Sequence, residues 1–163
     1  MYSPKEYALY LLKLRDRSEF EIRKKMKGKE FTPISIDETV DWLKEKQFID
    51  DDRFVQNFVR LHLMVGKSGS RKMEFQLRHY GIDKEIIEKY LSEITKDDEF
   101  IRAEELAKSW LKKKTEIPPE KVYERLGRFL LSRGFSYDII KPILDDARRI
   151  IKLHKALSLR KPE

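Results

Sequence analysis

Hydrophobic side chains recur at intervals of three and four residues along most of the chain. One clear stripe consists of Ile86, Ile87, Tyr90, Leu91 and Ile94. This spacing places apolar side chains on one face of an amphipathic α-helix, whereas a half-buried strand would alternate every second residue. No segment alternates convincingly. The pattern therefore predicts an all-α fold.

Capping residues and glycines divide the pattern into nine helices. Ser3, Ser18 and Ser35 each stand three residues before a glutamate, which is the signature of a capping box. The nine predicted helices begin at Ser3, Ser18, Ser35, Asp50, Ser68 or Ser70, Asp83, Asp97, Pro118 and Ser136. Glycines at positions 28, 66, 81 and 134 end four of them. Because Pro142 falls inside the last helix, we expect a kink there or a start later than Ser136.

The helices repeat in groups of three. The second-helix residues Ile22, Met26 and Phe31 recur as Met73, Leu77 and Ile82, and again as Leu126, Leu130 and Phe135. The first-helix residues Tyr7 and Leu11 match Phe54 and Phe58, and then Leu106 and Trp110. We therefore expect three tandem, helix-turn-helix-like repeats at 1–49, 50–96 and 97–163, the third with a basic C-terminal extension. Since one small repeat buries little core, neighbouring repeats should lean on each other in an elongated chain.

Composition narrows the possible functions. The 163 residues include 36 Lys or Arg and 29 Asp or Glu, which gives a net charge of +7. With no cysteine, the chain has neither disulfides nor thiolate metal sites. No apolar run is long enough to cross a bilayer, so we expect a soluble, cytoplasmic protein with no membrane contact.

Catalytic motifs are missing from the sequence. The three histidines fall one in each repeat, and helix capping accounts for Asp50, Asp51 and Asp52 without a metal. The segment 66–68 resembles the tail of a phosphate-binding loop, but Leu61 stands where that motif requires glycine. We therefore expect a protein that is not an enzyme and that has no metal or cofactor.

Basic residues cluster on the second helices and the turns of all three repeats. Such clusters suit a phosphate backbone or an acidic protein surface, although interleaved acids also fit ordinary solvated faces. Arg17 and Arg133 lie beside turns and could instead cap helix carbonyls. The candidate contact residues are Arg15, Arg17, Lys24, Lys25, Lys67, Arg71, Lys72, Arg78, Arg125, Arg128, Arg133, Arg148 and Arg149. Further basic residues are Lys112, Lys113, Lys114, Lys152, Lys155, Arg160 and Lys161.

Four ordered motifs carry a family resemblance. They are RDRSEFEI at 15–22, IDDDRF at 49–54 with FVR at 58–60, the set Gly69, Met73, Leu77, Gly81 and Ile82, and RGFSY at 133–137. Together they resemble the RecX family, the regulators of the RecA recombinase. The sequence departs from the family pattern at Val55, at the extra Asp52, and in its longer C-terminal extension.

The resemblance implies three tandem three-helix repeats in an elongated, curved arrangement. It also implies a monomer that binds RecA filaments on single-stranded DNA, lodges in the helical groove, and mostly inhibits ATPase, strand exchange and filament extension. Weak direct DNA binding is compatible with this expectation. The alternative is a stand-alone helical DNA-binding module that acts without RecA.

Overall fold

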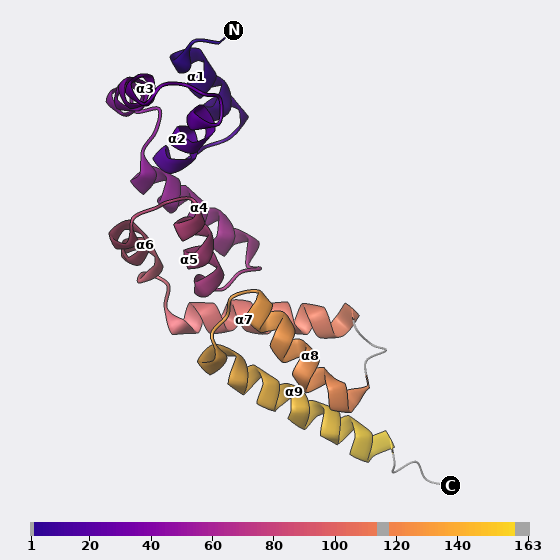
Figure 1. Cartoon of the computed structure of the whole chain (residues 1–163). Coiled ribbons are helices and arrows are strands. Elements are labelled where there is room, and N and C mark those ends of the chain that lie inside the picture. Colours follow the sequence, from indigo (N-terminus) through magenta and orange to yellow (C-terminus); the bar gives the residue numbers. More distant parts are fainter. Residues whose placement is uncertain (1, 114–117, 159–163) are drawn as a thin grey trace. The chain divides into compact units, whose positions relative to one another are not determined.

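A computed structural model describes residues 2–113 and 118–158, with side chains for 2–113, 118 and 121–149. Within these residues the secondary structure consists of nine α-helices and no strand (Figure 1). The helices are α1 (Pro4–Leu14), α2 (Glu19–Lys27), α3 (Pro33–Glu45), α4 (Asp51–Val65), α5 (Ser70–His79), α6 (Lys84–Leu91), α7 (Lys96–Lys113), α8 (Pro119–Ser132) and α9 (Tyr137–Ser158).

Local capping chemistry explains most of the helix starts. At α1 the predicted capping box is complete, because Ser3 Oγ accepts from the Glu6 amide and the Glu6 carboxylate accepts from the Ser3 amide. The predicted start of α3 at Ser35 was wrong. That helix begins at Pro33 with Thr32 as its N-cap, because a proline at the first helical position already has the required φ and lacks the N–H that would go unpaired.

The later starts follow the prediction closely. Helix α7 begins at Lys96, one residue before the predicted Asp97, and Thr95 Oγ1 accepts from the Asp98 amide at 3.1 Å. Helix α9 begins at Tyr137 and includes Pro142, which removes one N–H from the intrahelical ladder. Lys114, Arg160 and Lys161 lie outside the described residues, as do the side chains of Lys152, His154 and Lys155.

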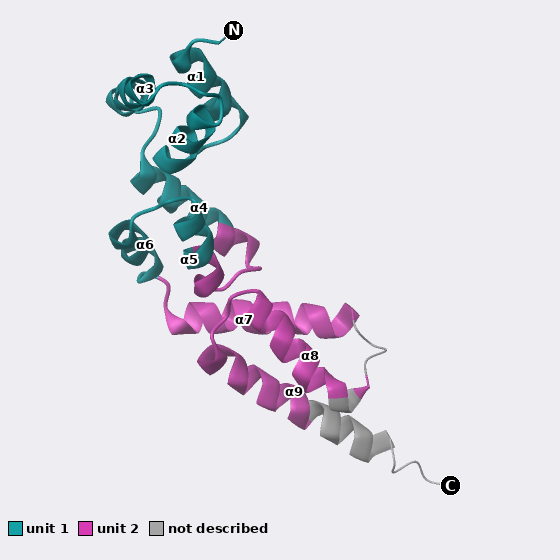
Figure 2. Cartoon of the chain, viewed as in Figure 1, with its two compact units in different colours: residues 1–61, 74–93 teal, residues 62–73, 94–163 magenta. Residues whose placement is uncertain are grey.

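The chain divides into two compact units (Figure 2). One consists of residues 1–61 and 74–93, and the other of residues 62–73 and 94–163. The boundary after residue 61 cuts α4 and the boundary after residue 73 cuts α5, whereas the boundary after residue 93 falls between α6 and α7. The second group of three helices is therefore shared between the units.

Each unit has an apolar core built mainly from a three-helix group. The core of the first unit consists of Tyr7, Ala8, Leu11, Ile22, Met26, Ile36, Val40, Leu43 and Ile49. The core of the second consists of Ala103, Ala107, Leu126, Leu130, Phe135, Ile139, Ile140, Ile143, Leu144 and Ala147. The sequence pattern predicted part of these cores, including Ile22 and Met26 in the first and Leu126, Leu130 and Phe135 in the second. For α7 it named Leu106 and Trp110, which are only partly buried, and the core residues of that helix are Ala103 and Ala107. Their burial supplies the main force that holds three short helices together.

The turn before the third helix has the same backbone geometry in all three groups. In each turn one residue has a left-handed backbone conformation, and the amide of the next residue donates a hydrogen bond to the carbonyl five residues earlier. These bonds join Phe31 to Met26 (3.3 Å), Ile82 to Leu77 (3.1 Å) and Phe135 to Leu130 (3.3 Å). The left-handed residues are Glu30 (φ 61°), Gly81 (φ 71°) and Gly134 (φ 84°). Gly28 is the C-cap of α2 at φ −68°, so the first turn places glutamate where the others place glycine.

Replacing Glu30 by glycine should therefore stabilise the protein. A side chain at positive φ costs about 1–2 kcal/mol, part of which is offset by the greater unfolded-state freedom of glycine. We expect Glu30→Gly to raise the free energy of unfolding by ~0.5–1 kcal/mol in urea titrations. The control Lys29→Gly changes a neighbouring residue of the same turn that has no positive φ, and it should be neutral or destabilising. Equal effects of the two substitutions would contradict the assignment of strain to Glu30.

Candidate interaction surfaces

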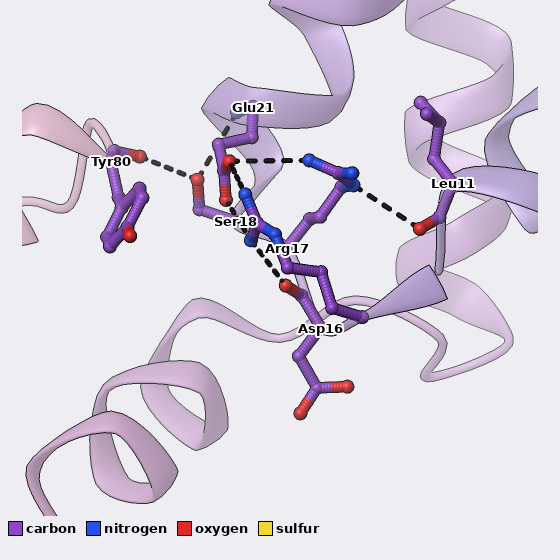
Figure 3. Close-up of polar contacts among 7 residues, drawn as sticks. Leu11, Asp16, Arg17, Ser18, Glu21 and Tyr80 are labelled. Atoms are coloured by element: carbon purple, nitrogen blue, oxygen red, sulfur yellow. Dashed lines mark hydrogen bonds and ion pairs between the residues drawn. The ribbon is translucent and has the colours of Figure 1, made fainter. Parts of the chain in front are cut away.

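The start of α2 docks on the turn before α6 within the first unit. The buried Ser18 hydroxyl donates to the Tyr80 carbonyl at 2.6 Å and also accepts from the Glu21 amide at 3.2 Å (Figure 3). Gly81 lies directly against Phe20, because a Cβ at Gly81 would come within 2.3 Å of the Phe20 Cγ atom. The Tyr80 ring packs edge-on against Phe54 at 5.6 Å between ring centroids. Hydrogen bonding and close packing thus join the first repeat to the second.

A carboxylate from the next repeat completes this joint. Asp51, in the first turn of α4, accepts from the Glu19 amide at 2.9 Å, which is the first free N–H of α2. Burial raises the pKa of the Asp51 carboxyl, and the neighbouring Glu19 and Asp83 carboxylates raise it further against the opposing effects of the Glu19 amide and Lys44. Asp51 therefore caps a helix in a neighbouring repeat and does not cap its own.

The second unit contains the same joint at equivalent positions. The Gly69 amide donates to the Arg133 carbonyl at 2.9 Å, and the Ser70 amide donates to Glu99 Oε1 at 2.8 Å. Gly69 lies 51 residues after Ser18, and Arg133 lies 53 residues after Tyr80, which are the offsets of the sequence repeat. A Cβ at Gly134 would come within 2.4 Å of the Lys72 backbone nitrogen.

These joints also revise the register of the first helices. Asp51 and Glu99 make the same contact 48 residues apart, and the buried pairs Val55 with Ala103 and Val59 with Ala107 share that offset. The sequence match of Phe54 with Leu106 used an offset of 52, one helical turn too long. The apolar periodicity misled that alignment because successive turns of α7 present similar apolar residues.

Two predicted contact residues of the first joint are occupied by the fold. Arg15 forms a bidentate ion pair with Glu21, with one N–O distance of 3.0 Å, and its guanidinium lies 5.9 Å from the Tyr80 ring centroid. Hydrogen bonding to Glu21 raises the pKa of Arg15. Arg17 Nε donates to the Leu11 carbonyl at 3.3 Å, and its side chain is only 9% exposed (Figure 3). Arg17 thus satisfies a carbonyl near the end of α1.

The second joint brings four predicted residues onto neighbouring segments. Because the Arg71 amide donates to the Gly134 carbonyl at 3.2 Å, the start of α5 lies against the turn that carries Arg133. Lys67 and Arg71 are exposed, whereas Lys72 and Arg133 are half-buried, with the Arg133 guanidinium 5.2 Å from the Phe129 ring centroid. We call Lys67, Arg71, Lys72 and Arg133 the joint cluster.

One basic residue near the joint cluster was missed by the sequence reasoning. Arg102 Nη1 donates to the Ser68 carbonyl at 3.3 Å, and its Nη2 atom is buried without a hydrogen-bond partner. Burial lowers the pKa of Arg102, although nearby Glu99 and Asp98 oppose that effect. No local motif marks Arg102 or Glu99, because their contacts join segments about 30 residues apart.

The other predicted residues are spread over exposed helix faces. Lys24, Lys25 and Arg125 are exposed, and Arg148 lies 5.9 Å from the Tyr123 ring centroid. Ion pairs within single helices join Arg78 to Glu74 (2.6 Å), Arg128 to Glu124 (2.8 Å) and Arg149 to Asp146 (3.9 Å). Such exposed pairs contribute little to stability, so these side chains can exchange partners at small cost.

The three consecutive aspartates each have a different partner. Asp50 Oδ1 accepts from the Arg53 amide at 3.1 Å and caps α4, whereas Asp52 accepts from Lys89 at 2.8 Å and from the Tyr90 hydroxyl. Among the described residues no group of three His, Cys, Asp or Glu side chains could hold a metal ion. Within the same residues, no helix combines the length and the apolar character needed to cross a membrane.

These observations define an all-helical protein whose three-helix domains are linked by a repeated joint. Three family models match the chain in order: the first three-helix domain of RecX at residues 5–43, the second at 50–91 and the third at 85–144. The chain belongs to the RecX family. This confirms the resemblance and the predicted all-α fold of three three-helix domains.

Individual relatives agree with the family models. The chain is 36% identical to the regulatory protein RecX of Clostridium botulinum (strain Eklund 17B / Type B), covering 88% of this chain and 68% of that one. It is 31% identical to the protein of the same name from Actinobacillus pleuropneumoniae serotype 5b (strain L20), covering 88% and 92%. The chain is accordingly a regulatory protein and not an enzyme.

Solved structures support the fold independently. The crystal structure of RecX from Lactobacillus salivarius matches with a TM-score of 0.74 at 24% identity, over 88% of this chain and 94% of that chain. A second crystal structure of a regulatory protein RecX matches with a TM-score of 0.78 at 23% identity, over 87% and 71%. At these identities the likeness concerns the fold.

Replacing Gly134 by alanine should destabilise the second unit strongly. A side chain at this position is strained because φ is positive. The added Cβ would also lie 2.4 Å from the backbone nitrogen of Lys72, and backbone cannot rotate away as a side chain can. We expect a loss of at least ~2 kcal/mol in urea unfolding. The control Gly66→Ala has a similar φ of 67° but no neighbour within 4 Å, so it should cost only about 1 kcal/mol. Equal losses would show that the close approach is not energetically important.

Substitutions at Asp51 should separate its hydrogen bond from its charge. Asp51→Asn keeps the acceptor for the Glu19 amide and removes a buried charge, whereas Asp51→Ala loses the cap and should cost about 1 kcal/mol. Because the native pKa is raised, ionisation of Asp51 opposes folding as the pH rises above about 4. We expect Asp51→Asn to gain stability relative to the wild type between pH 3 and pH 7. The opposite trend in pH-dependent unfolding would contradict this assignment.

Proposed function

We propose that this protein binds RecA nucleoprotein filaments in their helical groove and restrains them. Binding there would mostly inhibit the DNA-dependent ATPase, strand exchange and filament extension. The observation that carries the proposal is membership of the RecX family across all three domains. RecA is proposed as the partner because the sequence motifs resemble those of a family of RecA regulators.

The repeated joint supports an extended mode of binding. We propose that the repeats at 1–49, 50–96 and 97–163 are successive contact modules on a monomer. A helical filament presents the same surface at regular intervals, so linked modules can bind neighbouring subunits with a high effective concentration. Each module then needs only modest affinity of its own.

The joint cluster is the strongest candidate for a direct contact. Two backbone segments about 60 residues apart hold its cations close together, and Lys67 and Arg71 are exposed. Acidic protein surface and DNA phosphate are both suitable partners for such a cluster. The more distant candidates Lys24, Lys25, Arg78, Arg125, Arg128, Arg148 and Arg149 would add weaker contacts. Arg15 and Arg17 would act mainly by holding the first joint.

The ATPase activity of RecA on single-stranded DNA provides the test. We expect the wild-type chain to lower the ATPase rate at substoichiometric ratios and to sediment with filaments. Lys67→Glu combined with Arg71→Glu should raise the concentration needed for half-inhibition about tenfold, equivalent to ~1.4 kcal/mol of binding free energy. The matched control is Lys112→Glu combined with Lys113→Glu, which makes the same charge change at exposed positions of α7.

Three results would count against the proposal. An unchanged ATPase rate and no co-sedimentation of the wild type would exclude filament regulation. Equal weakening by the cluster and control variants would assign the effect to net charge alone. Binding to oligo(dT) that is as tight without RecA as with it, and that falls steeply with salt, would favour the stand-alone DNA-binding module.

A further inference from the structure

An apolar groove lies between α2 and α3 in the first unit. It encloses about 700 Å³, and its apolar lining consists of Phe20, Phe31, Pro33 and Ile36. Phe20 is 46% exposed although it also packs against Gly81, and the adjacent Ile34 is 72% exposed. Grouped apolar surface of this kind, bordered by charged residues, is typical of a binding site. No residue of the joint cluster lines this groove.

The border of the groove is basic. Its charged lining consists of Arg23, Lys24, Lys27 and Asp37. Arg23 is already neutralised, because it pairs with Glu19 at 2.7 Å and with Asp37 across the groove. Neither Lys24 nor Lys27 has a carboxylate within ion-pair distance among the described residues. The groove therefore presents uncompensated positive charge beside an apolar surface.

This combination selects one kind of occupant. A nucleic-acid backbone would satisfy the lysines but would leave the aromatic and aliphatic lining in contact with water. A bilayer is convex or flat on this scale, and it cannot fill a recess between two helices. An amphipathic protein segment satisfies both features, because one face enters the groove while carboxylates on its flanks meet the lysines.

We propose that this groove binds an acidic, amphipathic segment of a partner protein. A large apolar side chain of the segment fills the space between Phe20, Phe31 and Ile36, and flanking Asp or Glu side chains pair with Lys24 and Lys27. The ion pair between Arg23 and Asp37 connects α2 and α3 at the border of the groove. This binding site is separate from the joint cluster and does not depend on filament binding by that cluster.

The probe is a fluorescent synthetic helical peptide with Leu and Phe on one face and Glu and Asp on the other. Its binding to the full chain is measured by fluorescence anisotropy. We expect Lys24→Glu combined with Lys27→Glu to weaken binding at least tenfold, since both charges meet carboxylates in the complex. The matched control is Lys13→Glu combined with Lys29→Glu, exposed positions near helix ends of the same unit that do not line the groove. It should weaken binding less than threefold.

A second peptide tests the apolar half of the site without altering the protein. Serine in place of Leu and Phe should abolish binding to the wild type, and circular dichroism verifies that each variant is folded. Failure of the original peptide to bind would overturn the proposal, as would equal weakening by both variant pairs. Retained binding of the serine peptide would also overturn it, because the contact would then be purely electrostatic. Oligo(dT) or phosphatidylserine vesicles that displace the peptide completely would assign the groove to nucleic acid or membrane instead.

Discussion

The fold depends on how the first free N–H groups of a second helix are satisfied by the following repeat. At the start of α2, Asp51 accepts from the Glu19 amide and the Tyr80 carbonyl accepts from the hydroxyl of the N-cap Ser18. At the start of α5, Glu99 accepts from the Ser70 amide and the Arg133 carbonyl accepts from the Gly69 amide. A three-helix group alone would leave these donors to water and would bury few apolar side chains. The same four hydrogen-bonding positions therefore satisfy the helix ends and connect successive repeats. This requirement explains why the middle repeat is divided between the two compact units.

The joints also determine which basic side chains remain available. At the first joint Arg15 and Arg17 are held by Glu21 and by the Leu11 carbonyl, so their charges support the fold. At the second joint Arg71 forms no ion pair within the part of the chain that the structure describes, and Lys67 and Arg71 are exposed. The basic side chains beside the two joints thus have different roles. The apolar groove between α2 and α3 adds a third kind of surface, in which lysines accompany aromatic side chains.

Local sequence signals predicted the helices well but predicted the joints poorly. Local signals include the caps at Ser3 and Asp50 and the left-handed glycines Gly81 and Gly134. Each acts within a few residues, so the sequence alone predicts it. The start of α3 was misplaced because two capping signals, at Thr32 and Ser35, compete within one turn. The contacts of Asp51, Glu99 and Arg102 join segments that come together only on folding. The spacing of residues along the sequence therefore does not predict these contacts. The paired basic segments at Arg71 and Arg133 were identified separately, without any sign of their proximity.

The two joints differ in how they can accommodate change over evolutionary time. At the first, Gly81 has a φ of 71° and faces the side chain of Phe20, so a smaller residue at 20 removes the clash of a side chain at 81 and leaves only the cost of positive φ. At the second, Gly69 faces the Gly134 backbone and Gly134 faces the Lys72 backbone, at about 2.4 Å from any added Cβ. No side-chain exchange can move a main chain out of the way. The second joint therefore requires a pair of glycines for steric reasons, whereas at the first joint only the positive φ of Gly81 opposes a side chain once position 20 is small.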